Sequence, residues 1–397
     1  MSIHAKTLGL EGDWSEPDWP FLSLNEVDAI LRRFPEAGGA ERILSFSPRP
    51  FSAASVIATP VGKVFVKRHH RSIRDREGLH EEHGLIEHLR SRGASVPAVL
   101  ADEDGETAIA VGEWTYEVHA VARGMDVYEQ AQSWTPFLNA GHAHAAGRAL
   151  AKLHAAARDY AAPPRRSRML VTSFSIFSAD DPVAALERYA ESRPALAAYL
   201  AERDWRAQIE DTLFPFHERL RPWLGYLCPL WTHNDLHASN LLWSSTGPDA
   251  EVVSVIDFGL SDRTSAAHDI ATAIERNGVE WLEMGSGAKD IVHLDQIDAL
   301  LAGYEHQRPL SHEEAQTVVR LLPLVHGEFA LAETDYFLAI LHSDKSASLA
   351  YDGYLLGHAK WFASDAGKRL LEHLEAWASQ PRSTQVAKLE PSASAVR

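Results

Sequence analysis

The stretch WTHNDLHASNLLW, residues 231–243, places an aspartate, two histidines and two asparagines between apolar residues. The chain continues with a turn-rich segment, Thr246 to Asp249, and with VVSVIDFG, residues 252–259. The apolar end of the first stretch and the β-branched run of the second predict two short strands joined by that turn. Because such a hairpin brings its two open ends together, we expect Asp235 and Asp257 to lie side by side.

Two interpretations of the first stretch involve no transfer chemistry. His233 and His237 are four residues apart, as in the helical zinc motif His-Glu-x-x-His, but Asn234 stands where that motif has its glutamate. Alternatively, the polar side chains only hydrogen-bond a buried loop. Neither interpretation uses the hairpin or the second aspartate.

Phosphoryl transfer accounts for all of these residues. In kinases, a catalytic-loop aspartate accepts the proton of the acceptor hydroxyl, and an asparagine five residues later holds a magnesium ion. Asp235 and Asn240 have that spacing. A second aspartate, in Asp-Phe-Gly, chelates magnesium that bridges the nucleotide phosphates, and Asp257 begins such a triplet. Either motif alone is weak, but both in order, separated by a hairpin, predict a kinase-like site.

Composition narrows the class of protein. With 397 residues, 45% of them hydrophobic, the chain can bury a large core and is expected to form more than one lobe. A net charge of −17 disfavours nucleic acid as a partner, because a phosphate backbone requires clustered lysine and arginine. The single cysteine, Cys228, excludes an internal disulfide and suits a reducing compartment.

The sequence predicts no membrane span. Its first residues lack the basic and apolar segments of a secretory signal, and the most apolar long window, Leu321 to Leu341, is interrupted by charged side chains. We therefore expect a soluble, cytoplasmic protein.

Strand signals come early in the chain and helix signals later. A short helix is expected after the capping-box pair Ser23 and Glu26, and β-rich segments follow between Arg42 and Arg68. A helix ending at Gly93, two further strands and a long helix-rich region complete the order. This predicts an α+β protein with a small sheet lobe, a larger helical lobe and a ligand site between them.

The expected organisation has four parts. They are an N-terminal extension with one helix (residues 1–36), a nucleotide-binding N-lobe (37–122), a helical C-lobe with the catalytic loop and acceptor site (123–380) and a disordered tail (381–397).

From about residue 43 to residue 362 the chain resembles the aminoglycoside phosphotransferase and choline kinase family, small-molecule kinases with a protein-kinase-like fold. His233, Asp235 and Asn240 match the family's His-x-Asp-x-x-x-x-Asn loop, and the HND wording is similar to that of choline kinases. The resemblance implies ATP and Mg²⁺ as cofactors, with His233 orienting the loop.

A second part of the resemblance lies just beyond the hairpin. The segment HDIATAI, residues 268–274, resembles the family's Asp-Leu-Ala helix start, which implies that Asp269 braces the catalytic loop. A simple helix N-cap is the alternative.

Lys67 is the predicted phosphate-binding lysine, because alternation in KVFVKR sends it to the face opposite the valines; Lys63 is the weaker candidate. The resemblance implies that this lysine pairs with a carboxylate of the following helix. Glu82 fits the inner stripe of that helix and Glu81 is the fallback. A surface lysine and a solvated helix face are the alternative.

Other nucleotide contacts are expected from backbone and small residues. By resemblance, AVARG is the hinge, where backbone at Ala120 and Ala122 meets adenine. The predicted phosphate loop, SPRPFSAAS, lies in a segment without glycine from Ser45 to Pro60. Its small residues, Ser52 and Ser55 among them, permit close backbone approach and could donate to phosphate, or form a plain turn.

The acceptor is expected to be a small molecule. Only twelve residues separate Asp257 from Asp269, and no Ala-Pro-Glu follows, so the long segment that docks peptides in protein kinases is missing. On the segment HGEFALAETDYF, Glu328 and Asp335 are candidate ligands for an ammonium group of the acceptor. The alternative is a solvated helix face.

These observations predict an ATP- and magnesium-dependent phosphotransferase that acts on a hydroxyl of a small molecule. A homoserine, choline or sugar kinase of the same fold is the alternative to an antibiotic kinase. A protein Ser/Thr kinase and a catalytically idle nucleotide-binding module are the more distant ones. The residues above determine neither the acceptor, the choice between ATP and GTP, nor the oligomeric state.

Overall fold

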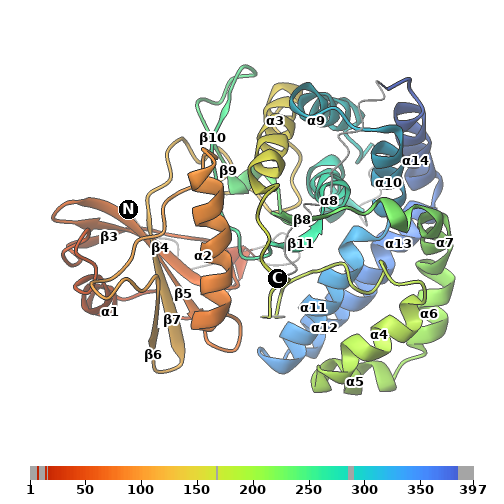
Figure 1. Cartoon of the computed structure of the whole chain (residues 1–397). Coiled ribbons are helices and arrows are strands. Elements are labelled where there is room, and N and C mark those ends of the chain that lie inside the picture. Colours follow the sequence, from red (N-terminus) through yellow and green to blue (C-terminus); the bar gives the residue numbers. More distant parts are fainter. Residues whose placement is uncertain (1–6, 9–13, 16, 167–168, 285–289, 383–397) are drawn as a thin grey trace, which may run out of the picture.

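The computed structural model describes residues 7–8, 14–15, 17–166, 169–284 and 290–382. These residues form two lobes, a sheet-based N-terminal lobe and a larger helical C-terminal lobe (Figure 1). The predicted α+β class and the order of the lobes are confirmed. Most of the predicted tail, residues 383–397, lies outside the described residues.

A five-stranded antiparallel sheet with the order β3-β4-β5-β7-β6 forms the N-terminal lobe. Its strands are β3 (Arg42–Phe46), β4 (Ala53–Thr59), β5 (Gly62–His70), β6 (Ala108–Val111) and β7 (Trp114–Ala120). A separate pair near the N-terminus, β1 (Thr7–Leu8) and β2 (Trp14–Ser15), is also antiparallel. The β4–β5 hairpin confirms the turn predicted between the two β-rich segments.

The two faces of the sheet have different partners. On one face, Val64 and Val66 share an apolar core with helix α1 (Leu24–Leu31), whose predicted capping box is present. Glu26 of that capping box also accepts a hydrogen bond from Arg68 at 2.6 Å, which ties α1 to β5. The other face, which carries Lys67, is turned toward helix α2 (Arg76–Ser91), and Figure 1 shows α2 between the sheet and the helical lobe.

The C-terminal lobe consists of helices packed around α8 and α11. All residues of α8 (Ala266–Gly278) are buried, and so are the first thirteen of α11 (Val325–Ala339). The surrounding helices are α3 (Ala140–Ala157), α4 (Pro182–Glu191), α5 (Pro194–Ala201), α6 (Trp205–Thr212), α7 (Phe214–Leu220), α9 (Leu294–Gln307), α10 (His312–Leu321), α12 (Asp344–Ser348), α13 (Leu356–Ala363) and α14 (Asp365–Ala378).

Short turns of other helix types join these elements. They are the 3₁₀ turns Arg221–Tyr226, Ala238–Asn240 and Trp281–Glu283, and a π-helical segment, Leu349–Leu355.

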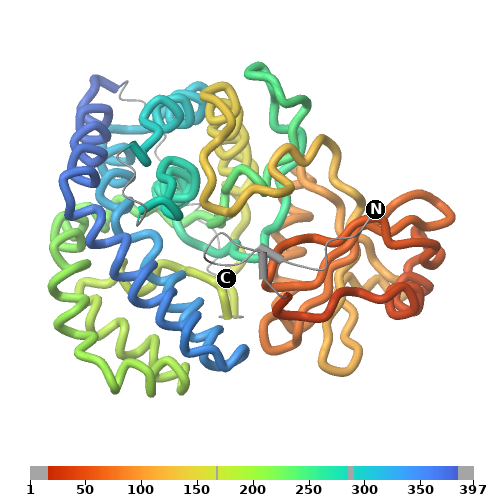
Figure 2. Tube along the Cα trace, turned by 180° about the vertical axis from the view of Figure 1, so that it is seen from behind, coloured from red at the N-terminus to blue at the C-terminus, as the bar shows by residue number. Residues whose placement is uncertain are grey.

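Two small antiparallel pairs position the catalytic loop at the junction of the lobes. Strand β9 (Leu241–Trp243) pairs with β10 (Val252–Val255), which confirms the predicted hairpin. Strand β8 (Pro229–Thr232) pairs with β11 (Asp262–Ser265), so the segments before the first aspartate and after the second are also joined. Figure 2 shows this region, in green, between the two lobes.

None of the helices in the described part of the chain is both long and apolar enough to cross a membrane.

Candidate active site

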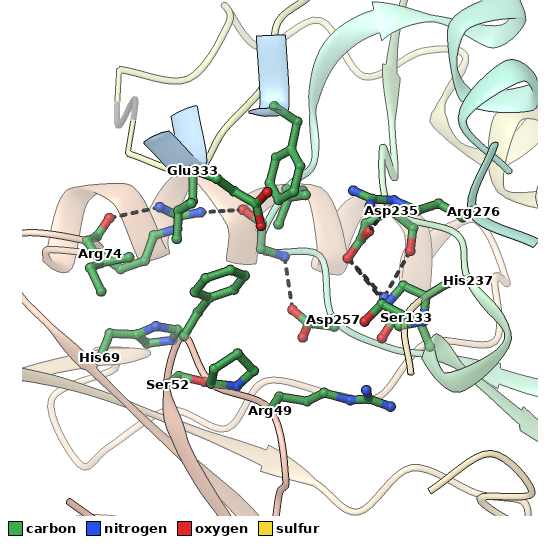
Figure 3. Close-up of a pocket in the computed structure, with 18 of the residues that line it drawn as sticks. Arg49, Ser52, His69, Arg74, Ser133, Asp235, His237, Asp257, Arg276 and Glu333 are labelled. Carbon is green, nitrogen blue, oxygen red and sulfur yellow. Dashed lines mark hydrogen bonds and ion pairs between the residues drawn. The ribbon is translucent and has the colours of Figure 1, made fainter. Parts of the chain in front are cut away.

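A pocket lies between the two lobes and is lined by residues of both (Figure 3). Its empty space, including openings to solvent, is about 970 Å³. Five predicted site residues line it: Ser52, Lys67, Asp235, Asn240 and Asp257. The structure therefore brings the β5 lysine, the catalytic-loop pair and the second aspartate into one cavity.

Asp235 lies among polar groups that keep it ionised. Its Oδ1 is 3.2 Å from Nε of Arg276, and its Oδ2 is 3.5 Å from Nε2 of His237 (Figure 3). Burial alone raises the pKa of Asp235, but the electrostatic effects of His237 and Arg276 outweigh it and hold the pKa below its usual value. Asp235 is thus a carboxylate able to accept a hydrogen bond from an acceptor hydroxyl.

Asp269 of α8 holds the backbone of the catalytic loop in place. Its carboxylate accepts hydrogen bonds from the backbone N–H of His233 at 2.9 Å and of Asn234 at 2.8 Å. Asn234 needs this support because its φ of 62° lies in the left-handed region. Helix α8 is capped by Ser265 instead, so the bracing role implied for Asp269 is confirmed.

His233 faces the loop and not a metal site. Its Nε2 is 3.0 Å from the carbonyl oxygen of Ile256, and its Nδ1 accepts a hydrogen bond from the backbone N–H of Asp235 at 3.2 Å. His237 instead turns toward Asp235 and Ser239, and the 3₁₀ turn begins only at Ala238. The two histidines share no helix face, so the helical zinc interpretation is wrong.

Asn240 and Asp257 present oxygen atoms to the pocket. The side-chain amide of Asn240 donates from Nδ2 to the backbone carbonyl of Asp235 at 2.9 Å, which leaves Oδ1 as the atom able to ligate a metal. Asp257 adopts a φ of 60° and 37% of its side chain is exposed. Carboxylate and amide oxygens are ligands that Mg²⁺ accepts, so this donor set fits the predicted ion.

Lys67 reaches across the cleft to Asp257. Its Nζ is 3.0 Å from Oδ1 of Asp257. Burial lowers the pKa of this lysine, but the charge of Asp257 outweighs it and the pKa is raised. The predicted pair with Glu82 is not the observed one. Glu82 lies 3.6 Å from Nη2 of the buried Arg165, because that side chain from the helical lobe fills the space beside α2.

Three predicted nucleotide contacts are not in the pocket lining. Ser55 stands opposite Val66 in the β4–β5 register and is 1% exposed, so its hydroxyl points into the α1 core, away from Lys67. Its side chain cannot reach phosphate. At the expected hinge, the N–H of Ala120 donates to the carbonyl of Ala98 at 2.9 Å, and Ala122 is half-buried.

The candidate acceptor residues Glu328 and Asp335 also lie outside the pocket lining, and other groups of the protein already contact both carboxylates. Glu328 accepts hydrogen bonds from the backbone N–H of Ser173 at 2.7 Å and of Ile176 at 3.0 Å, which fixes that loop. Asp335 is 3.9 Å from Nε of Arg193. The solvated-face alternative is wrong, because the first thirteen residues of this helix, which include Glu328 and Asp335, are buried.

Sequence reasoning missed two charged residues beside Asp235. Arg276 and Glu333 both line the pocket and are 3% and 2% exposed. Arg276 lies seven residues after Asp269 on α8, which is two turns along the same helix face, so that spacing was the signal that could have found it. Glu333 had no comparable signal among the acidic residues of α11.

The glycine-free loop covers the pocket with side chains. Arg49, Pro50, Phe51 and Ser52 line it. The guanidinium of Arg49 donates to the carbonyl oxygen of Ala131 at 3.0 Å, and the ring of Phe51 meets that of Tyr336 edge-on, with centroids 5.2 Å apart. The loop is thereby fastened to the C-terminal lobe.

This arrangement agrees with a family match. Residues 51–320, more than half of the chain, match the family described as "Phosphotransferase enzyme family". The chain belongs to this phosphotransferase family. The phosphotransferase is accordingly an enzyme that transfers a phosphoryl group to an alcohol group of a small molecule, and the protein-kinase and idle-module alternatives are set aside.

Known proteins resemble the phosphotransferase over most of its length. The homoserine kinase of Chelativorans sp. (strain BNC1) is 27% identical over 322 residues, which is 78% of this chain and 83% of that protein. The homoserine kinase of Methylobacterium radiotolerans is 29% identical over 304 residues, covering 76% and 82%.

Solved structures confirm the fold of the phosphotransferase. A microcompartment-associated aminopropanol kinase aligns with a TM-score of 0.57 at 16% identity, over 88% of this chain and 98% of that one. An amicoumacin kinase solved with AMP-PNP and Ca²⁺ aligns with a TM-score of 0.55 at 14% identity, over 85% and 94%.

Proposed function

We propose that this phosphotransferase is an amino-acid kinase that transfers the γ-phosphoryl group of ATP, in the presence of Mg²⁺, to the hydroxyl of homoserine or a close analogue. The observation that carries the acceptor assignment is the placement of a buried cation and a buried acid, Arg276 and Glu333, in the pocket that holds Asp235.

Asp235 orients the acceptor hydroxyl and accepts its proton. Its depressed pKa keeps it ionised at neutral pH, and the amide of Asn240 fixes its position through the 2.9 Å bond to its backbone carbonyl. The hydroxyl oxygen then attacks the γ-phosphorus while ADP leaves.

Asn240 and Asp257 would hold the magnesium ion through their oxygen atoms, and the bound ion would neutralise charge on the phosphates. Lys67 would then exchange its contact with Asp257 for the phosphates. Arg49 would supply a second positive charge from the loop that takes the place of the glycine-rich phosphate loop of other kinases. Its Nη1 already donates to the carbonyl oxygen of Ala131 and so anchors this loop.

Arg276 is suited to bind the carboxylate of the acceptor. Its contacts to Asp235 and to the hydroxyl of Tyr354 use Nε and Nη1, and a guanidinium has five N–H donors, so donors remain for a ligand. The rings of Trp134 and Phe329 lie 5.2 and 4.9 Å from its guanidinium carbon and hold its plane.

Glu333 is suited to bind the ammonium group. It lines the same pocket from α11, and an approaching ammonium supplies the counter-charge that its buried carboxyl lacks. Homoserine carries a carboxylate and an ammonium on one carbon at the end of a short chain that ends in a hydroxyl, and the two relatives compared above are homoserine kinases.

The test is ADP release from Mg·ATP with a panel of acceptors, with Asp235→Asn as the control for contaminating activity. We expect homoserine to exceed 3-amino-1-propanol, choline, sugars and aminoglycosides by roughly 100-fold in kcat/KM, because an analogue without the carboxylate leaves the remaining donors of the buried Arg276 without a partner. Equal turnover of homoserine and 3-amino-1-propanol would contradict the assignment of Arg276.

A second candidate is an amino alcohol without a carboxylate. The observation that favours it is the existing contact of Arg276 with Asp235, which already partners this guanidinium. In that case 3-amino-1-propanol would be the better substrate, and Arg276→Lys would change its KM little.

We also propose a cytoplasmic location with no nucleic-acid or membrane partner, from the strongly acidic composition and from Cys228, a free thiol exposed at the surface.

A further inference from the structure

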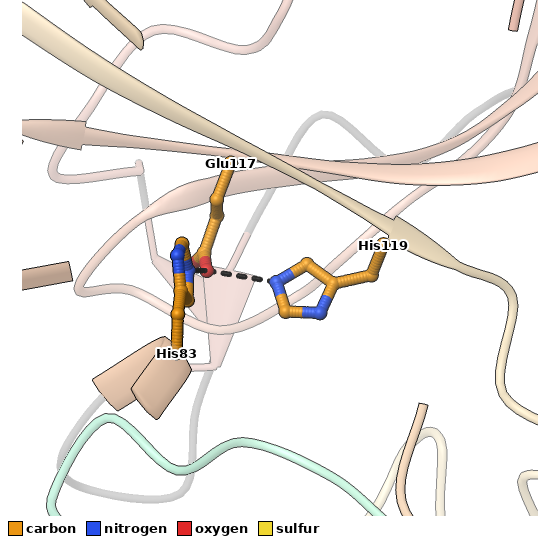
Figure 4. A group of neighbouring side chains, drawn as sticks. All are labelled: His83, Glu117 and His119. Atoms are coloured by element: carbon orange, nitrogen blue, oxygen red, sulfur yellow. Dashed lines mark hydrogen bonds and ion pairs between the residues drawn. The ribbon is translucent and has the colours of Figure 1, made fainter. Parts of the chain in front are cut away.

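Beside the catalytic pocket, three imidazole rings converge on one buried carboxylate, and one of them, His69, also lines that pocket. Nε2 of His83 and Nε2 of His119 lie 2.8 and 2.7 Å from Oε2 of Glu117, and Nε2 of His69 lies 2.9 Å from Oε1 (Figure 4 shows the first three residues). The four residues come from α2, β5 and β7, and each is at most 8% exposed.

Within the part of the chain that the structure describes, no lysine or arginine side chain hydrogen-bonds Glu117. Among the described residues, the side chains that hydrogen-bond it are the three histidines, and none is lysine or arginine. Lys67 stands opposite it in the β5–β7 register but bonds Asp257.

A buried carboxylate requires a compensating positive charge. A protonated imidazole is one source of that charge. A metal ion is the other source, and it converts neutral imidazoles into ligands.

The donor chemistry suits a transition metal. Nitrogen atoms of His83 and His119 and a carboxylate oxygen of Glu117 lie within 4.8 Å of one another, and two imidazoles with a carboxylate are a common zinc ligand set. The other nitrogen of His83, Nδ1, is 2.9 Å from Oγ1 of Thr107, which aims Nε2 at Glu117. Bond lengths to zinc of about 2.0–2.2 Å give ligand-to-ligand distances of about 3.3 Å, so side-chain shifts of about 0.5 Å admit the ion.

We propose that His83, Glu117 and His119 form a binding site for a divalent transition-metal ion of the zinc class, with His69 at the second carboxylate oxygen. The site is separate from Asn240 and Asp257, which offer only oxygen donors. An ion there joins α2 to β7 behind Lys67, and so stabilises the N-terminal lobe.

The experiment measures metal bound by the full-length protein after loading with Zn²⁺ or Co²⁺ in excess Mg²⁺ and desalting. We expect about one equivalent per chain, and for Co²⁺ a visible absorption band of a nitrogen-containing tetrahedral site. His83→Gln and His119→Gln should lose the metal and the band. His80→Gln is the matched control, since His80 lies on the same helix with 40% of its side chain exposed, and it should retain both.

Two results would overturn the proposal: wild-type protein that retains less than about a tenth of an equivalent after loading, or equal retention by all four proteins. The wild-type measurement needs no variant, so misfolding of a variant does not weaken it. As a second readout, Zn²⁺ should raise the melting temperature of wild type and His80→Gln; an equal rise in well-folded His119→Gln would also refute the site.

Discussion

The ammonium of Lys67 lies 3.0 Å from the carboxylate of Asp257, so the phosphate-binding lysine of one lobe is bonded to the predicted metal ligand of the other. The contact joins the two sides of the cleft and links residues that are 190 positions apart in the sequence. Because Asp257 is also the predicted ligand for Mg²⁺, a bound metal–nucleotide complex would replace the Lys67–Asp257 pair by contacts from both residues to the ligand.

Asp257→Asn should therefore abolish the dependence of nucleotide binding on Mg²⁺. The amide has one neutral oxygen in place of a charged carboxylate, and we expect kcat to fall by about 100-fold or more. Titration of a fluorescent ATP analogue with and without Mg²⁺ measures the effect. Asp249→Asn, on the exposed turn of the same hairpin, is the matched control, and a Mg²⁺ response in Asp257→Asn equal to that of wild type would refute the assignment.

Asp235→Asn should separate catalysis from nucleotide binding. Removing the base should lower kcat by about 10²–10⁴-fold, because general-base catalysis supplies that range. Affinity for Mg·ATP should change little, since Asp235 faces the acceptor hydroxyl and its neighbours Arg276 and His237. Calorimetric titration with a non-hydrolysable ATP analogue tests this, and equal loss of turnover and nucleotide affinity would indicate a structural role.

Asp269→Asn should damage both stability and turnover. The carboxylate accepts from two backbone N–H groups and from His154, and an amide cannot accept all three. Loss of hydrogen bonds to a buried charge should reduce the free energy of unfolding by roughly 2–4 kcal/mol. Urea denaturation measures this against Asp295→Asn, which changes an exposed aspartate of α9. Unchanged stability of Asp269→Asn would contradict the bracing role.

The catalytic loop and its hairpin were predictable because their signals are local. Asp235, Asn240 and Asp257 lie within 23 residues, and a short hairpin leaves few ways to arrange them. Alternation along β5 likewise placed Lys67 correctly. The same alternation along β4 predicts that Ser55 faces the α1 core, as observed. The expectation that Ser55 contacts phosphate did not take this alternation into account.

The acceptor side was not predictable because it depends on tertiary packing. The acidic residues of α11 look alike in the sequence, but a helix turns about 100° per residue, so Glu328 and Glu333 point about 140° apart. Which of them faces the pocket is decided by how α11 packs against its neighbours. Arg165 is a similar case, since nothing near it in sequence indicates that it would meet Glu82.

Glu328→Gln and Glu333→Gln should therefore have opposite consequences. Glu328 fixes the loop at Ser173 and Ile176, so its replacement should lower the free energy of unfolding by about 1–3 kcal/mol and leave the KM for the acceptor unchanged. Replacement of Glu333 should raise that KM by about 10-fold or more, because a buried ion pair with the ammonium is lost. Melting curves and initial rates on both variants test this, and a raised KM in Glu328→Gln alone would reverse the assignment.

Glu333 should also control the pH dependence of acceptor use. Burial raises its pKa from 4.5 to about 8, so below that pH the carboxyl is neutral and binds an ammonium poorly. We expect kcat/KM for an ammonium-bearing acceptor to rise as pH increases toward 8, and Glu333→Gln to lack this rise.

The effect of the same titration on folding stability has the opposite sign. A raised folded-state pKa means that the contribution of protonated Glu333 is complete below pH 4.5 and is lost as pH rises through about 8.

Both parts are measurable on the same pair of proteins. Rate profiles between pH 6 and 9 give the first, and urea unfolding at several pH values gives the second, with the difference between wild type and Glu333→Gln isolating this one group. Profiles that coincide would show that Glu333 does not titrate in this range, and the ammonium would then need another partner in the pocket.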